Sequence, residues 1–102
     1  MSRSFNAIQS IEVKLLGAFK TALGKEQIIL QLSGKQKLAT VIHSIAESSA
    51  ELKRVLLDSE LEDSCPNAII IVNGKTISVL NGLDTEVGDG DKIVLVPAIH
   101  GG

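Results

Sequence analysis

The chain has 102 residues, a formal net charge of −2, 44% apolar residues and only two aromatic residues, both Phe. That length suits a single domain with an aliphatic core, and the weak charge and scarce aromatic rings argue against direct nucleic-acid binding. No apolar run approaches the ~20 residues of a membrane span, and the one cysteine, Cys65, has no internal disulfide partner, so we expect a reduced, cytoplasmic protein.

The N-terminal third predicts a leader and two strands. Residues 1–10 are polar and are expected to form a flexible leader to a domain over residues 11–96. Residues 11–15 alternate apolar and polar side chains, which is typical of a strand with one buried face. Gly17 and residues 20–24 are expected to turn the chain into a second, antiparallel strand over residues 27–32.

An apolar stripe predicts the main helix of the domain. Its members lie three and four residues apart: Leu38, Val41, Ile42 and Ile45. Either Thr40 caps the helix or its first turn begins at residues 37–39. Residues 51–57 continue this helix or form a second short one, and the acidic stretch over residues 58–66 is expected to be a loop.

Three strand signals follow in the C-terminal third. Residues 68–72 are an unbroken apolar run, and Asn73-Gly74 after them is a strong hairpin signal that predicts a return strand over residues 75–79. Leu83 and Val87 are expected to anchor the next connection to the core. A tight turn over residues 88–91 then leads into a last strand over residues 92–96.

This order of elements predicts an α+β fold. The last strand is continuously apolar and therefore belongs in the middle of the sheet, beside the first strand. A parallel pairing of those two strands needs the long crossover that the helix provides. The result is the β-grasp (ubiquitin-like) arrangement, a mixed sheet wrapped around one main helix.

One face of the predicted sheet lacks cover, because one helix covers only one face. The runs over residues 69–72 and 93–96 do not alternate, so either Ile70, Val72, Val94 and Val96 or their neighbours point away from the helix. Leu16 and Ile29 are expected to join them. We interpret this patch as a partner-binding site; the alternatives are cover by residues 51–66 or by a second copy of the chain.

The last six residues read Pro97-Ala98-Ile99-His100-Gly101-Gly102 and are expected to form an extended tail over residues 97–102. Two residues without side chains can pass through a narrow channel. The tail therefore predicts that the reactive group is the main-chain carboxylate of Gly102. His100 either orients that carboxylate or is a surface residue.

The side chains themselves provide no catalytic set. His43, His100 and Cys65 do not have the spacing of a zinc site, and no nucleophile–base pair stands out. His43 is interpreted as a partly exposed structural residue of the helix. We therefore expect no bound cofactor or metal, and no enzyme in its own right.

Several short motifs in the C-terminal third resemble one known superfamily. The chain is similar to the ubiquitin-like sulfur carriers and small modifiers: the small subunit of molybdopterin synthase (MoaD), the archaeal small modifier proteins, the ubiquitin-related modifier of tRNA thiolation and, more distantly, the thiazole-synthesis carrier ThiS. The resemblance lies in Val72-Asn73-Gly74-Lys75, Gly82-Leu83-Asp84-Thr85, Asp89-Gly90-Asp91, the following apolar strand, Pro97 and Gly101-Gly102.

The resemblance implies a chemistry for the tail. An adenylating partner enzyme uses ATP and Mg²⁺ to convert the Gly102 carboxylate to an acyl-adenylate, and a sulfur donor then gives a thiocarboxylate. The sulfur passes to a molybdopterin precursor, on the large subunit of molybdopterin synthase, or to tRNA through a thiolase. Attack by a target-protein lysine gives an isopeptide bond instead. Gly101 gives access, and partner contacts are expected at Pro97, Ile99, His100, Leu16, Ile29, Val94 and Val96.

Two other functions stay open on the sequence. One is a dedicated ubiquitin-like modifier that forms isopeptide bonds through Gly102. The other is a plain β-grasp interaction domain that is never activated. A thiocarboxylate, a set of lysine conjugates, or neither would separate the three.

Overall fold

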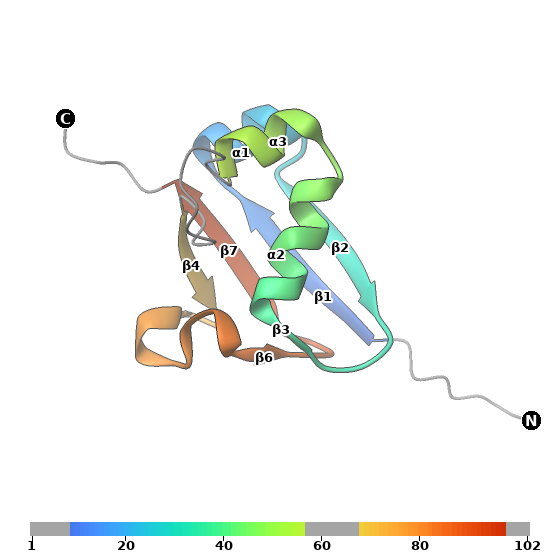
Figure 1. Ribbon diagram of the computed structural model, residues 1–102, viewed down its shortest axis with the longest axis vertical. Coiled ribbons are helices and arrows are strands. Elements are labelled where there is room, and N and C mark those ends of the chain that lie inside the picture. The colour runs from blue at the N-terminus through green and yellow to red at the C-terminus, as the bar shows by residue number, and fades with distance from the viewer. Residues whose placement is uncertain (1–8, 57–67, 98–102) are drawn as a thin grey trace, which may run out of the picture.

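The computed structural model describes residues 9–56 and 68–97. It contains a five-stranded mixed sheet in the order β2-β1-β7-β4-β5 (Figure 1). Only β1 and β7 are parallel to each other; the other neighbouring strands are antiparallel. The strands are β1 (Gln9–Leu15), β2 (Gln27–Leu32), β4 (Ala68–Val72), β5 (Lys75–Thr76) and β7 (Lys92–Pro97).

The predicted topology is confirmed. β7 lies in the middle of the sheet, between β1 and β4, and its apolar run has a helix-facing side and an outward side. β1 and β7 pair in parallel from Glu12 opposite Lys92 to Leu15 opposite Leu95. β1 begins at Gln9 and β7 ends at Pro97, so the sheet reaches one or two residues past the expected limits of 11 and 96.

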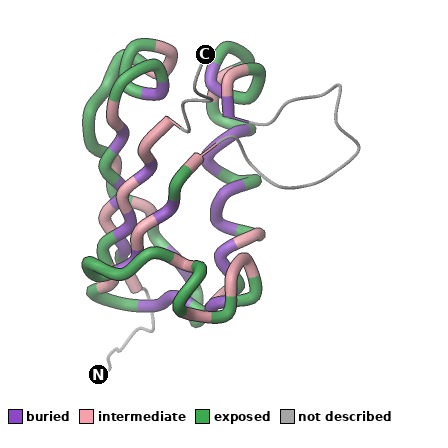
Figure 2. Tube along the Cα trace, turned by 90° about the vertical axis from the view of Figure 1, so that its left-hand side faces the viewer, coloured by how far each residue is buried: buried purple, intermediate pink, exposed green. Residues whose placement is uncertain are grey.

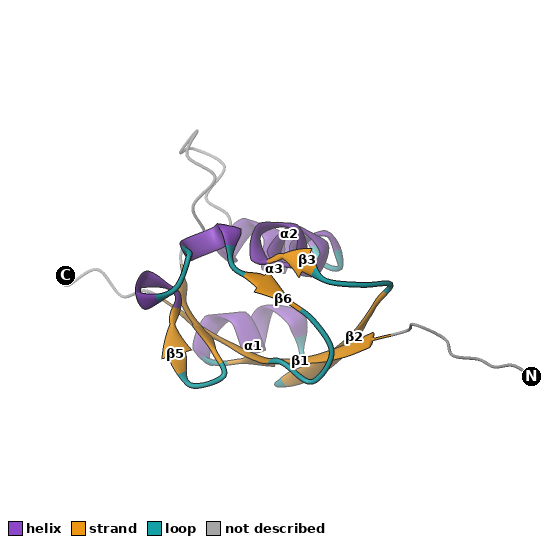
Figure 3. Ribbon diagram, turned by 90° about the horizontal axis from the view of Figure 1, so that it is seen from below, coloured by secondary structure: helices purple, strands orange, loops and turns teal. Residues whose placement is uncertain are grey.

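Two helices cover one face of the sheet, α2 (Leu38–Glu47) and α3 (Ala50–Leu56) (Figures 1 and 3). α2 starts at Leu38, which confirms the earlier of the two predicted starts, and Thr40 is not its N-cap. Ser48 and Ser49 separate the helices: the Ser48 hydroxyl donates to the Ile45 carbonyl, and the Ser49 hydroxyl accepts from the Leu52 amide. The residues after α2 thus form a second helix and do not continue the first.

The prediction of a simple turn after β1 is wrong. Residues 17–23 form a third helix, α1 (Gly17–Leu23), and its Phe19 is buried. Gly24, with φ +82°, ends the helix by donating its amide to the Lys20 carbonyl. Glycine is also a turn signal, so the glycines at both ends of this short helix led to the prediction of a turn.

The core lies between the helices and the inner side of the sheet (Figure 2). As predicted, the stripe of α2 is buried, together with Leu52 and Leu56 of α3. Burial of these aliphatic side chains stabilises the fold through the hydrophobic effect. The sheet contributes alternate residues to this core: Ile11, Val13, Leu15, Leu32, Ile70, Val72, Ile93 and Leu95.

The connections differ in detail from the prediction. Asn73 and Gly74 have φ of +52° and +86°, as a two-residue hairpin requires, but β5 ends at Thr76 and a short 3₁₀ helix follows at Ile77–Val79. A small antiparallel pair, β3 (Gln36–Lys37) and β6 (Glu86–Val87), was not predicted. A second 3₁₀ helix spans Gly82–Asp84. Leu83 is partly buried against the core and Val87 is fully buried, so both predicted anchors are confirmed.

Within the described residues, none of the helices has both the length and the apolar character needed to cross a membrane.

Candidate functional site

The outward side of the sheet, which we call the open face, carries no helix among the described residues (Figure 3). Strand register shows which side chains share it. Ile69 lies opposite Val96, and Ile71 lies opposite Val94. Directly opposite residues of antiparallel strands point to the same side, so these four form one group, the apolar patch.

The apolar patch contains two of the predicted partner contacts, Val94 and Val96, and two further residues, Ile69 and Ile71. Val94 and Val96 point away from the helices, as the first predicted alternative required, but neither alternative is right for both strands, because the antiparallel register places Ile69 and Ile71 opposite Val96 and Val94. On β4, Ile69 and Ile71 face outward, while Ile70 and Val72 are buried. Ile69 is 47% exposed, one of three large apolar side chains that are exposed in the described residues. An apolar surface group of this kind is a candidate interaction site.

Charged side chains border the apolar patch on the β1 side. Lys14 lies opposite Val94 across the β1–β7 pairing, and Glu12 lies opposite Lys92. Ile29 is 56% exposed on β2, opposite Glu12 on the other side of β1. The predicted contact residue Ile29 is therefore on the open face, but β1 and its charged side chains separate it from the four-residue patch.

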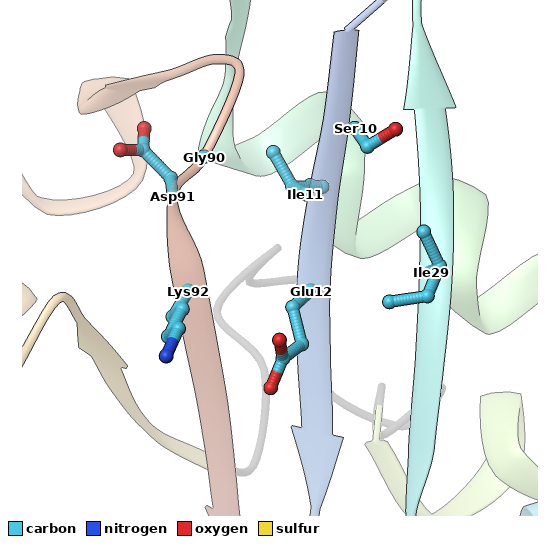
Figure 4. Close-up of a pocket in the computed structure, with 7 residues that line it drawn as sticks. All are labelled: Ser10, Ile11, Glu12, Ile29, Gly90, Asp91 and Lys92. Carbon is cyan, nitrogen blue, oxygen red and sulfur yellow. The ribbon is translucent and has the colours of Figure 1, made fainter.

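A shallow depression of ≈ 270 Å³ occupies this charged corner of the open face (Figure 4). The close-up shows Glu12 and Lys92 on adjacent strands, with Ile29 beyond Glu12. The depression is formed by surface side chains of three strands and the turn before β7, with no nucleophile beside a base. Its lining consists of Ser10, Ile11, Glu12, Ile29, Gly90, Asp91 and Lys92.

The base of the tail forms the second part of the site. β1 pairs with β7 as far as Leu15 opposite Leu95, and the Leu16 amide still donates to the Leu95 carbonyl at 3.1 Å. β7 then continues to Pro97, which pairs with Ala68 of β4 on its other side. Pro97 and the half-buried Leu16, both predicted partner contacts, thus lie together where β7 leaves the sheet.

A network of hydrogen bonds fixes the start of β7. Asp91 Oδ1 accepts from Asn73 Nδ2 at 3.0 Å, and Asp91 Oδ2 accepts from the Gly88 amide at 2.8 Å. Asn73 Oδ1 in turn accepts from the Lys92 amide at 3.0 Å. These contacts tie the β4–β5 hairpin to the turn before β7, and they account for two of the sequence motifs that carried the family resemblance.

Several predicted site residues lie outside the described residues: Ile99, His100, Gly101 and Gly102 of the tail, with Cys65 and the acidic stretch over residues 58–66. His43 is exposed on α2, as expected. In residues 9–56 and 68–97, His, Cys, Asp and Glu side chains nowhere gather in a group of three or more that could hold a metal ion. The described part of the chain contains the apolar patch and Pro97, and the predicted reactive group lies outside it.

Comparison with known proteins identifies the family. The model of the ThiS family matches residues 13–102, so the chain belongs to the ThiS family. Small archaeal modifier protein 3 of Haloferax volcanii is 25% identical over 93 residues, which are 90% of this chain and 98% of that protein. The "Putative sulfur carrier protein" of Archaeoglobus fulgidus is 40% identical over 53 residues, which are 51% of this chain and 57% of that protein.

Solved structures agree with this assignment. The small archaeal modifier protein 1 of Methanosarcina acetivorans has 28% identity and a TM-score of 0.75, covering 95% of this chain and all of that chain. The predicted β-grasp fold and the resemblance to sulfur carriers and small modifiers are thus confirmed. A chain in the BexX/CysO complex of Amycolatopsis orientalis is 26% identical, with a TM-score of 0.61 and coverage of 90% and 99%, so a relative of this chain assembles with another protein.

Proposed function

We propose that this protein is a sulfur carrier whose working group is the Gly102 carboxylate, made reactive by a separate adenylating enzyme. The observation that carries this proposal is the family match, which runs to residue 102 and includes the Gly101-Gly102 pair. The chain itself is the substrate of that enzyme and the carrier of the sulfur, and it is not catalytic. We place the reaction in the cytoplasm, where ATP is available.

Activation begins with a carboxylate, which is a poor electrophile because it is ionised and lacks a good leaving group. One Gly102 oxygen attacks the α-phosphorus of ATP on the partner enzyme, and pyrophosphate leaves with the bonding electrons. Mg²⁺ on that enzyme neutralises the phosphate charge that develops. The product is an acyl-adenylate at the tip of the tail.

Sulfur transfer follows at the same carbonyl carbon. A donor that supplies a hydrosulfide equivalent attacks the acyl-adenylate, the C–O bond to AMP breaks, and AMP takes the electron pair. The tail then ends in a thiocarboxylate, whose sulfur can pass to a molybdopterin precursor or to tRNA. Gly101 has no side chain to obstruct the approach to Gly102 in a narrow channel.

The open face supports the docking step of this proposal. An activating enzyme must hold the domain while the tail enters its active site, and Val94 and Val96 lie on the strand that leads into the tail. A partner that covers the apolar patch therefore receives the tail in a defined direction. Lys14 and Lys92 beside the patch add charge that fixes register and orientation of the partner.

A second function is favoured by one specific observation. Over 93 residues this chain is 25% identical to small archaeal modifier protein 3, whose name describes a protein modifier. In that function a lysine ε-amine attacks the acyl-adenylate and forms an isopeptide bond with Gly102. Both functions share the activated intermediate and differ only in the nucleophile.

The deciding experiment is the intact mass of the protein isolated from its own cells without reduction or alkylation, with fragmentation of the tail. A mass gain equal to one sulfur replacing one oxygen, mapped to Gly102, supports the sulfur carrier. Free carboxylate together with Gly-Gly-linked lysines on other proteins supports the modifier. Absence of both products contradicts the proposal and favours a plain interaction domain.

Deletion of Gly102 tests the role of the tail directly. We expect the truncated protein to keep its urea unfolding midpoint, because the sheet ends at Pro97, and to lose all modification. The substitution Gly101→Leu should likewise block modification, through the side chain it adds. Normal modification of either variant would contradict the assignment of the reactive group.

A further inference from the structure

We propose that Gly17, the first residue of α1, is a positioning residue that holds Pro97 and thereby sets the direction in which the tail leaves the sheet. The inference rests on the proposed function, because a direction matters only if the tail must reach an active site. It assigns a role to an element that lies outside the open face and the tail.

The geometry begins with the unequal lengths of β1 and β7. β1 ends at Leu15 opposite Leu95, whereas β7 continues for two residues, to Pro97. On the β4 side, this extension still has partners: Val96 lies opposite Ile69, and Pro97 lies opposite Ala68. On the β1 side, the ladder has ended and the chain turns into α1.

Gly17 occupies the place where β1 would have continued. A Cβ atom added to Gly17 would lie 3.0 Å from Pro97 Cγ and 3.4 Å from Pro97 Cδ. A carbon pair at 3.0 Å is closer than van der Waals contact, so the bare Cα of Gly17 lets the proline ring lie against the start of α1. Proline has no N–H. It therefore gives up no N–H hydrogen bond when its ring packs against α1 where β1 no longer pairs with β7.

The proline, the last residue that the structure describes, is thus held between β4 on one side and Gly17 on the other. Because proline also fixes its own φ, the first tail residue leaves from a constrained position. Any substitution that enlarges Gly17 must displace either the proline ring or α1. If the proline ring is displaced, the direction of the tail changes while the apolar patch stays unchanged; if α1 is displaced, the direction of the tail stays the same.

The chain provides a matched control for Gly17→Ala. Gly82 has φ +59°, close to the +56° of Gly17, and it also begins a short helix. A Cβ on Gly82 would meet nothing within 4 Å. Both alanine variants therefore impose the same left-handed backbone strain, and only Gly17→Ala adds the contact with Pro97.

The first readout needs no partner. In NMR spectra of the free protein, Gly17→Ala should shift the Val96 and Ala68 amides and the Pro97 carbons, and Gly82→Ala should leave them unchanged. The second readout is the initial rate at which the ¹⁵N-labelled, unmodified chain is modified at Gly102 in an extract of its own cells with ATP and Mg²⁺, followed by intact mass and corrected for the folded fraction.

We expect Gly17→Ala to lower the maximal rate by about tenfold, since a small misplacement of a reacting group is costly. The chain concentration at half-maximal rate should stay unchanged, because the docking face is intact. Gly82→Ala should behave as wild type. In a Pro97→Ala background, which lacks the ring atoms, Gly17→Ala should have no further effect on rate.

Two outcomes would overturn this proposal, and a third would refute the proposed function. Equal rates for Gly17→Ala and Gly82→Ala would overturn it, as would an undiminished effect of Gly17→Ala in the Pro97→Ala background. A wild-type chain that is never modified would instead refute the proposed function. In that case the NMR comparison alone would still decide whether Gly17 sets the position of Pro97.

Discussion

At the scale of single residues, two of the motifs that pointed to this family have a structural role in the described part of the chain. Asn73 and Asp91 are 18 positions apart, and their side chains bond to each other and to the backbone on both sides. They hold the start of β7, the strand that leads to the tail. A motif can therefore identify a family through its fold and say little about its chemistry.

Asp91→Asn tests this network. Both carboxylate oxygens of Asp91 accept from N–H donors, so an amide must turn its NH₂ group toward one of those donors. We expect the free energy of unfolding to fall by about 1–2 kcal/mol, the usual cost of a hydrogen bond lost with a donor left unpaired. Urea unfolding at unchanged m-value measures this loss.

Asp89→Asn is the control for that experiment. Asp89 Oδ1 accepts from the Ser10 amide at 2.9 Å, and asparagine can make the same bond with its remaining oxygen. We therefore expect a clearly smaller loss. Equal losses for the two variants would mean that charge near the turn, and not the two-sided hydrogen bonding of Asp91, stabilises the start of β7.

At the scale of elements, the sequence predicted what periodicity can define. The alternation over residues 11–15 and the stripe of α2 each predict one buried face, and both predictions are confirmed. The run over residues 68–72 allows two orientations of the strand, because a continuous apolar run does not show which residues face the core. Only the register with β7 decides that Ile69 and Ile71 face outward.

α1 is the longest of the elements that the sequence prediction missed. Seven residues are too few for a clear helical period, and a helix of that length is unstable by itself, so tertiary contacts must hold it. Phe19 provides them: its side chain is 1% exposed and lies in the core. Ala22 and Leu23 also pack against the core, but Phe19 is the one buried residue of the helix, and one buried residue gives no periodic pattern.

Phe19→Ala should therefore cost far more than its place in a short surface helix indicates. We expect a loss of about 3–5 kcal/mol in the free energy of unfolding, as for other buried aromatic residues. Phe19→Leu retains most of the apolar volume and should cost less than about 1.5 kcal/mol. Urea unfolding of both variants measures the difference; similar small losses would mean that α1 does not dock on the core.

At the scale of the whole molecule, the two faces of one sheet have different tasks. The inner face packs against α2 and α3 to form the core, whereas the open face carries no helix among the described residues. β7 belongs to both, because it contributes Ile93 and Leu95 to the core and Val94 and Val96 to the apolar patch. The same central strand ends where the tail begins, so docking and tail position are coupled through it.

The open face can be tested separately from the core with a pair of lysine substitutions. Ile69 is 47% exposed in the apolar patch, and Val79 is 68% exposed in the 3₁₀ helix that follows β5. Each change replaces an exposed aliphatic side chain with lysine, so each should alter the free energy of unfolding by no more than about 0.5 kcal/mol. Differences between them then report on binding.

We expect Ile69→Lys to raise the chain concentration needed for half-maximal modification in the extract by about tenfold, which corresponds to ~1.4 kcal/mol of lost docking energy. Val79→Lys should leave it unchanged. This result is the opposite of that expected for Gly17→Ala, which should lower the maximal rate and leave the chain concentration at half-maximal rate unchanged. If Ile69→Lys lowered the maximal rate alone, the apolar patch would not be the docking surface, and the partner would have to recognise the domain elsewhere, with the exposed Ile29 on β2 as the next residue to substitute.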